Sequence, residues 1–317
     1  MERPTGARSV SRRAFISALS AGLPLQLPQP SHPENGCREL KRPDLLHVYA
    51  CRVFTARGPG IEGLHHQVFT AAPPVPPAKR RDVIVLHEIT GANVAFFQYV
   101  DTLVDAGFTV HCPVLFSTAP PSGLRKFFVL FEACGPSSDF RCFTQTETSR
   151  VNQWLVELAT DVAGSERRKL GVIGMCLTGI QPLGMLRCRS VVAPVLCQPT
   201  LPTRDVVLTH PPPATGRPIA FTTWSRDPEA ERDLGLPQSD IDFAYARVRD
   251  EDLKMLLVRY QHDPISSSVR ADRLVEMFKP RLELFELAGH EHSSLVTDPG
   301  PGEPGRKKVV EFLKAIL

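Results

Sequence analysis

Short apolar runs alternate with apolar residues at helical spacing along most of the chain. The runs are typical of buried strands and cover residues 82–87, 169–175, 191–196, 255–258 and 282–287, with one more strand around Val110. Helical spacing is clearest over residues 96–104, 151–162 and 309–317. Because strands and helices alternate, we expect an α/β fold with a mainly parallel sheet covered by helices on both faces. The apolar residues at helical spacing are then expected to pack in the core.

Composition allows one substantial domain. The chain has 317 residues, of which 42% are apolar, and a formal net charge of +3. We expect a flexible leader or signal over residues 1–40 and a single domain over residues 41–317. No basic run or RNA-binding signature favours nucleic acid. No segment reaches the roughly 18 to 20 apolar residues that a membrane span needs. A monomer is favoured.

A candidate nucleophile follows the run at residues 169–175. Cys176 lies between Gly174 and Gly179, which resembles the thiol form of a nucleophile elbow, a sharp turn between strand and helix. At either flanking position a Cβ atom is expected to clash. The positive end of the following helix would favour a thiolate. The alternative is a buried cysteine that acts as a small hydrophobic residue.

Two backbone amides are candidates for an oxyanion hole. The amide of Leu177 directly follows the nucleophile, where such donors normally lie. The loop over residues 87–91 follows the strand at 82–87, and its Ile89 amide is the second candidate. Together they would hold the negative charge that develops on an attacked carbonyl oxygen.

The sequence supplies an acid and a base after the cysteine, in the order that this kind of sheet uses. Asp263 follows a strand end and is the candidate acid, although an Asp-Pro pair also begins ordinary turns. His292 is the preferred base and His290 the alternative; either could instead be a surface histidine. The His-x-His pair has no further ligand cluster, so neither a metal nor a cofactor is expected.

Several segments together resemble the dienelactone hydrolase family of α/β hydrolases. The resemblance covers about residue 45 to the C-terminus. It depends on residues 87–91, 105–115, 171–179, 193–202, 263–264 and 292–295.

The resemblance implies an α/β-hydrolase fold and a Cys-His-Asp triad of Cys176, His292 and Asp263. It also implies that Glu88 is the acidic residue that contacts the resting thiol. The chain departs from the family at Ile180, where a second glycine is common, and in two further places. Pro182 and Gly184 interrupt the helix after the nucleophile, and Ser293 to Val296 lack the arginine that holds a substrate carboxylate in this family.

Other features leave alternatives open. Residues 11–16 resemble a twin-arginine export signal, whereas a cytoplasmic protein with a flexible leader is the default. Export would allow disulfides among Cys37, Cys51, Cys134 and Cys142. We expect buried free thiols at Cys112, Cys188 and Cys197. Residues 117–141 and the Pro-rich residues 205–238 are candidate loops that line or cover the site.

These observations predict a hydrolase of small ester or lactone substrates. His292, oriented by Asp263, would take the proton of Cys176; the thiolate would attack the carbonyl; and water would resolve the thioester. The competing hypothesis is a hydrolase fold that binds a small molecule or a partner without turning it over.

Overall fold

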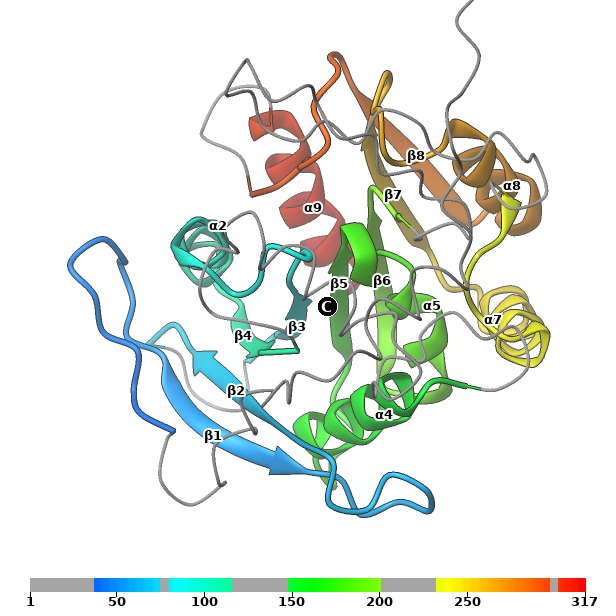
Figure 1. Ribbon diagram of the computed structural model, residues 1–317. Coiled ribbons are helices and arrows are strands. Elements are labelled where there is room, and N and C mark those ends of the chain that lie inside the picture. Colours follow the sequence, from blue (N-terminus) through cyan, green and yellow to red (C-terminus); the bar gives the residue numbers. More distant parts are fainter. Residues whose placement is uncertain (1–36, 75–79, 116–147, 201–231, 297–301) are drawn as a thin grey trace, which may run out of the picture. The chain divides into compact units, whose positions relative to one another are not determined.

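One eight-stranded sheet organises the chain in the order β1-β2-β4-β3-β5-β6-β7-β8 (Figure 1). The computed structural model describes residues 37–74, 80–115, 148–200, 232–296 and 302–317. The strands are β1 Ala50–Thr55, β2 His65–Ala71, β3 Asp82–Leu86, β4 Thr109–Pro113, β5 Leu170–Met175, β6 Val191–Cys197, β7 Met255–Tyr260 and β8 Leu282–Leu287. Strand β2 pairs antiparallel with β1 and β4, and the remaining pairs are parallel. The predicted fold class is confirmed.

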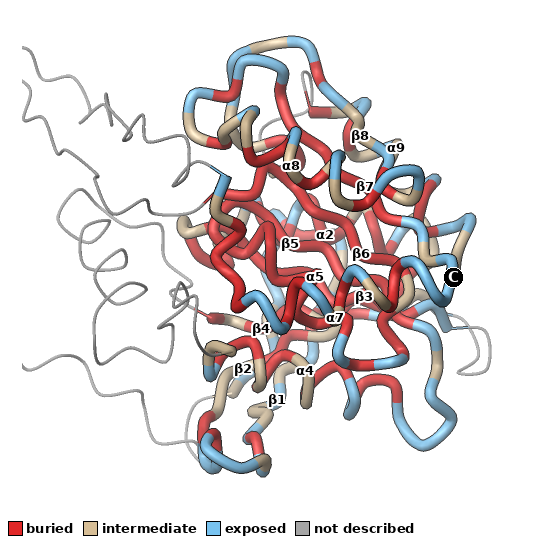
Figure 2. The backbone as a smooth tube through the Cα atoms, turned by 90° about the vertical axis from the view of Figure 1, so that its right-hand side faces the viewer, coloured by how far each residue is buried: buried red, intermediate tan, exposed pale blue. Residues whose placement is uncertain are grey.

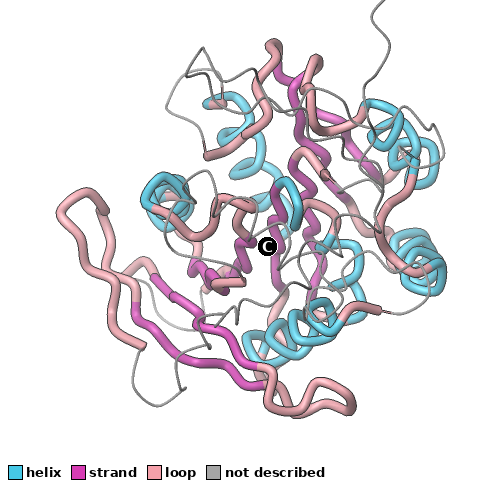
Figure 3. Tube along the Cα trace, viewed as in Figure 1, coloured by secondary structure: helices cyan, strands magenta, loops and turns pink. Residues whose placement is uncertain are grey.

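Helices cover both faces of this sheet (Figure 3). Helices α2 (Val94–Asp105) and α9 (Glu303–Ile316) pack on one face. The other face carries α4 (Arg150–Ala163), α7 (Gln238–Asp250) and α8 (Ser268–Phe278).

Strand β3 shows how the sequence produces these layers. Val83 and Val85 point into the cluster around α2 and α9, whereas Ile84 and Leu86 point into the cluster on the opposite face. Every residue of β3, β5 and β7 is buried, which Figure 2 shows as a continuous red centre. An unbroken apolar run is therefore the expected signature of such a strand, because neither face meets water.

The parallel strands bring distant residues to one edge of the sheet. The carboxyl ends of β3, β5, β6, β7 and β8 are followed by Glu88, Cys176, Gln198, Asp263 and His292 in that order. In open α/β sheets this edge is where ligands bind.

A disulfide between Cys37 and Cys51 ties the beginning of the described chain to strand β1. It is one of the pairings that the sequence allowed under export. Cys112, Cys188 and Cys197 are buried free thiols, as expected.

Some sequence-based predictions fall outside the described residues. These are the possible signal at residues 11–16, most of the leader, the loop at 117–141 with Cys134 and Cys142, and the Pro-rich segment at 205–231. Among the described residues, none of the helices has the length and apolar character that crossing a membrane requires.

Candidate active site

Cys176 occupies a strained turn at the end of β5. Its φ angle is +56°, in the left-handed region that residues with a side chain rarely adopt. A short 3₁₀ helix, Cys176–Thr178, follows the strand directly. The residue is 6% exposed. A left-handed residue between strand and helix is the backbone geometry of a nucleophile elbow.

Two glycines make this turn possible. A Cβ atom on Gly174 would lie 2.2 Å from the carbonyl oxygen of Thr178, and one on Gly179 would lie 2.7 Å from that of Cys197. The expected clashes are therefore present. Gly179, however, lies one residue beyond the second glycine of the elbow motif, and Thr178 takes that place.

Thr178 fastens the turn to strand β3. Its hydroxyl oxygen accepts a hydrogen bond from the Met175 amide at 3.0 Å and lies 3.1 Å from the His87 carbonyl oxygen. The hydroxyl thus joins the elbow to the loop over residues 87–91.

The helix after the elbow is too short for the role expected of it. Helix α5, Gln181–Gly184, has four residues, and a 3₁₀ helix, Met185–Arg187, follows it. A macrodipole sums over aligned peptide units, so this interrupted segment supplies little of the field that we expected to favour a thiolate. Pro182 lies in the first turn of α5, and Gly184 is its last residue.

His292 and Asp263 form a close pair after β8 and β7. The Nδ1 atom of His292 lies 2.8 Å from Oδ2 of Asp263, whose side chain is fully buried. The amides of Ile265 and Ser266 donate to Oδ1 of Asp263 at 2.8 and 2.9 Å. These bonds fix the carboxylate, which in turn fixes the imidazole ring.

The pKa of His292 is raised to about 11 in spite of burial, which by itself lowers it. The adjacent Cys176 sulfur and the Asp263 carboxylate both favour the protonated ring. The Nε2 atom is buried and has no hydrogen-bond partner among the described residues. It is thus available for a proton transfer on the side away from Asp263.

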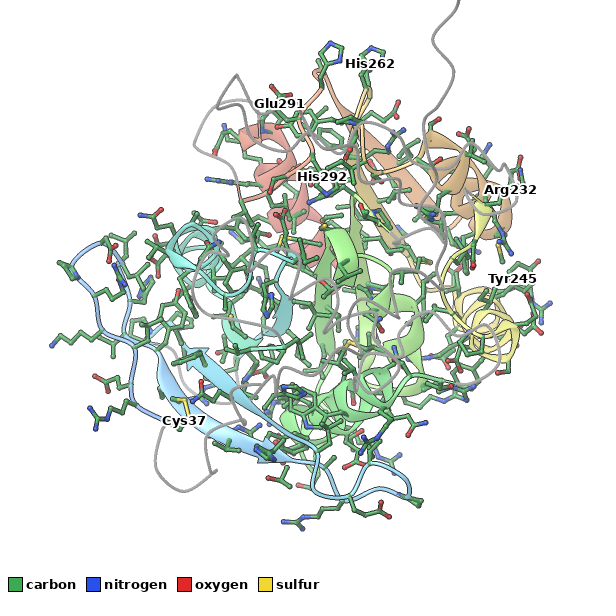
Figure 4. The ribbon with its side chains drawn as sticks, viewed as in Figure 1. Cys37, Arg232, Tyr245, His262, Glu291 and His292 are labelled. Atoms are coloured by element: carbon green, nitrogen blue, oxygen red, sulfur yellow. A yellow bond between two sulfur atoms is a disulfide. The ribbon has the colours of Figure 1, made fainter. Side chains whose placement is uncertain are left out.

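His290, the alternative base, lies on the surface. Its ring stacks on that of His262 with centroids 5.0 Å apart and an angle of 26° between the planes. Figure 4 shows His262 at the outer end of the β7–β8 side, whereas His292 points inward. Of the two candidates, only His292 contacts Asp263.

Glu88 is buried beside this pair. It is 7% exposed, and its Oε1 atom accepts hydrogen bonds from the Ser293 hydroxyl and, at 2.9 Å, from Nε2 of Gln198. Burial raises the pKa of Glu88, while the Ser293 bond and the charge of His292 oppose the rise.

The loop over residues 87–91 lies against the elbow. The Ile89 side chain packs on Cys176 and Leu177. Burial lowers the pKa of His87 to about 4. The neutral ring accepts from the Leu115 amide at 2.9 Å through Nε2, so Nδ1 donates to the Glu88 carbonyl oxygen at 2.8 Å. A buried neutral imidazole therefore holds the loop that carries the Ile89 amide.

Sequence reasoning missed Gln198 and the hydroxyls of Ser293 and Ser294. Gln198 is fully buried at the carboxyl end of β6, and its place after a buried strand is the signal that could have found it. Within the described residues, no group of three or more His, Cys, Asp or Glu side chains could hold a metal ion.

The comparisons with known proteins agree with this architecture. Residues 67–206 match the model of the dienelactone hydrolase family. Over these residues, fewer than half of its 317, the chain is similar to that family. The match supports a hydrolase that acts on ester bonds. The search of curated proteins found no match.

Solved structures share the fold at low sequence identity. A protein of Klebsiella pneumoniae described as a dienelactone hydrolase is 14% identical, with a TM-score of 0.51 over 84% of this chain and 99% of its own. The Pyrococcus furiosus esterase Pf2001 is 15% identical, with a TM-score of 0.52 over 90% of this chain and 99% of its own. These neighbours establish the α/β-hydrolase fold.

Proposed function

We propose that the protein hydrolyses small carboxylic esters or lactones through a triad of Cys176, His292 and Asp263. The observation that carries the proposal is the His292–Asp263 bond of 2.8 Å, together with the interaction of the same imidazole with the Cys176 sulfur. A nucleophile, a base and an orienting acid in this relation are the parts of covalent acyl transfer.

The proposed reaction has two halves. In the first, His292 holds the proton taken from Cys176, and the sulfur attacks the substrate carbonyl carbon. The tetrahedral intermediate then collapses to a thioester, and its alcohol leaves with the proton from His292. In the second half, His292 takes a proton from water, the resulting hydroxide attacks the thioester, and the acid product leaves as the thiol is restored.

The amides of Leu177 and Ile89 are the proposed oxyanion donors. Among the described residues neither amide donates to another group, and the Ile89 side chain packs on Cys176 and Leu177. Preorganised donors of this kind contribute a factor of about 10² to 10³ each to the turnover rate.

The test is hydrolysis of a small activated ester by matched variants. Cys176→Ala should abolish turnover, and His292→Ala should lower kcat by about 10³-fold or more. His290→Ala is the control, because its ring lies on the surface against His262, and it should retain wild-type kcat. Turnover retained by Cys176→Ala would refute the proposed nucleophile.

A non-catalytic binding protein is the competing function, and thiol labelling separates the two. Iodoacetamide should alkylate Cys176 much faster than the buried Cys112, and His292→Ala should slow only the Cys176 reaction. Equally slow labelling of both thiols would favour the binding protein.

We also infer that the chain works in an oxidising compartment. The Cys37–Cys51 disulfide supports this location over the cytoplasmic default, because cytosolic thiols are kept reduced. The N-terminal sequence of the mature protein, which would begin beyond the signal-like residues 11–16, tests it.

A further inference from the structure

Gln198 connects Glu88 to the segment that carries the catalytic histidine. Its Nε2 atom donates to Oε1 of Glu88 at 2.9 Å, and its Oε1 atom accepts from the Ser294 hydroxyl. The amide orientation is fixed by this chain of bonds, since one end must donate and the other must accept. Gln198 therefore spans the gap between the loops after β3 and β8.

The backbone of Gln198 is strained and held in place. Its φ angle is +33°, and its amide donates to the Val258 carbonyl oxygen at 2.8 Å. A left-handed residue with a large side chain is strained and persists where the surroundings fix it. This fixed backbone holds the start of the fully buried Gln198 side chain, whose amide donates to Glu88.

The described partners of Glu88 carry no positive charge apart from His292. Its hydrogen-bond donors are an amide and a hydroxyl, and the titratable groups that interact with it are His292, Asp263 and Cys197. Residues 293–296 are Ser, Ser, Leu and Val. Two carboxyl groups therefore face one imidazole, and a substrate carboxylate beside them would add a third like charge in a buried site.

We propose that Gln198, with Ser293, is the positioning residue of Glu88, and that the carboxylate so held selects substrates that are uncharged next to the reacting carbonyl. The inference rests on the proposed function, because it assumes that Cys176 is the nucleophile. In this proposal the Glu88 carboxylate disfavours anionic substrates relative to neutral ones, and Gln198 holds that carboxylate beside the proposed triad.

The first test compares alkylation of Cys176 by neutral iodoacetamide and anionic iodoacetate, read by peptide mass spectrometry. As pH rises through the raised pKa of Glu88, the carboxylate forms, and the iodoacetate-to-iodoacetamide rate ratio should fall several-fold. Glu88→Gln should abolish this fall. A wild-type ratio that stays constant between about pH 5 and 9, or an unchanged fall in Glu88→Gln, would overturn the charge assignment.

The positioning role is tested by Gln198→Leu in the same assay. Loss of a donor to the ionised carboxyl should move the fall in the ratio to higher pH by about one unit. Gln181→Leu is the matched control: Gln181 is also buried, but its amide oxygen accepts from Asn152 at 2.7 Å. It should lower the melting temperature without moving the transition. The positioning role would be overturned if Gln198→Leu lowered the melting temperature but left the pH at which the rate ratio falls unchanged.

Two further measurements keep the inference separable from the proposed function. Ser293→Ala removes the second donor to Glu88 and should move the same transition if Gln198→Leu does not fold. Wild-type protein should hydrolyse 4-nitrophenyl butyrate at least about tenfold faster than the anionic 4-nitrophenyl hemisuccinate, judged by kcat/KM. Equal rates would contradict the proposed selectivity. No turnover of any ester would sink the proposed function alone, because alkylation needs no turnover.

Discussion

At the scale of single residues, the conformation of Cys176 carries the argument for a nucleophile. A cysteine that merely filled the core would have no reason to adopt a φ of +56°. Left-handed backbone costs a residue with a Cβ atom about 1 to 2 kcal/mol. The strained conformation occurs at a turn that places the Cys176 thiol next to His292.

This strain predicts an unusual order of stabilities for two inactive variants. Cys176→Gly should be more stable than Cys176→Ala, with a free energy of unfolding about 0.5 to 1 kcal/mol higher. Glycine relieves the left-handed strain, and this outweighs its larger unfolded-state entropy. Urea unfolding of both variants measures the difference. A less stable Cys176→Gly would contradict a strained turn.

The raised pKa of His292 predicts how its stabilising effect depends on pH. Because the folded pKa is about 11 and the unfolded value is about 6.5, the contribution is complete below about pH 6.5 and is lost as pH rises toward 11. The stability difference between wild type and His292→Phe should therefore shrink from pH 6.5 to pH 10 in urea titrations. His290→Phe is the control and should show no such trend. A difference that grows with pH would contradict the ion pair.

At the scale of elements, the apolar runs predicted the positions of strands better than any other pattern in the sequence. The run at residues 82–87 is β3, and the strands at 255–258 and 282–287 are β7 and β8. In β3 and β7 every residue is buried, so an apolar run and a buried strand coincide. Strand β8, at the edge of the sheet, alternates apolar with charged residues and is only partly buried.

The hairpin of β1 and β2 was not predicted. Both strands lie toward one side of the sheet, and their residues are largely half-buried, so polar and apolar side chains mix. The partners of Glu88 could not be predicted either, because Gln198 and Ser293 both reach Glu88 only when β6 and β8 end at the same edge. The proposed triad could be suggested from the sequence, because each of its members closely follows a predicted strand.

Gly179 tests whether the elbow needs its close backbone contacts. A Cβ atom there would lie 2.7 to 2.9 Å from backbone atoms of Cys197, Pro199 and Cys176, none of which can rotate away. Gly179→Ala should therefore lower the free energy of unfolding by about 1 to 3 kcal/mol and kcat by about 10²-fold. Ester turnover and urea unfolding measure both effects.

Gly305→Ala in α9 is the control for Gly179→Ala. Its added Cβ atom would lie 3.3 Å or more from its neighbours, and alanine favours the helix. Its turnover should equal that of the wild type. If Gly179→Ala were as active as Gly305→Ala, the close backbone contacts at Gly179 would not be needed for turnover.

At the scale of the whole molecule, the site and the disulfide occupy different parts of the sheet. The site lies at the carboxyl ends of β3 and β5 to β8, whereas Cys37–Cys51 fastens β1, the first strand in the sheet order. The two should therefore respond separately to a reducing agent. Stability should depend on the disulfide, and turnover should depend on a reduced Cys176.

Reduction is thus expected to lower stability while sparing activity. The bond joins residues 14 apart, and a closed loop of about 15 residues corresponds to about 3 kcal/mol of stabilisation. Dithiothreitol should lower the melting temperature of wild type but not that of a Cys37→Ser, Cys51→Ser double variant, which should already melt at the lower temperature. Ester turnover below both melting temperatures should stay within about twofold in all samples, because the thioester chemistry needs only the free thiol. If wild type melted at the same temperature with and without reductant, the disulfide would contribute nothing to the fold.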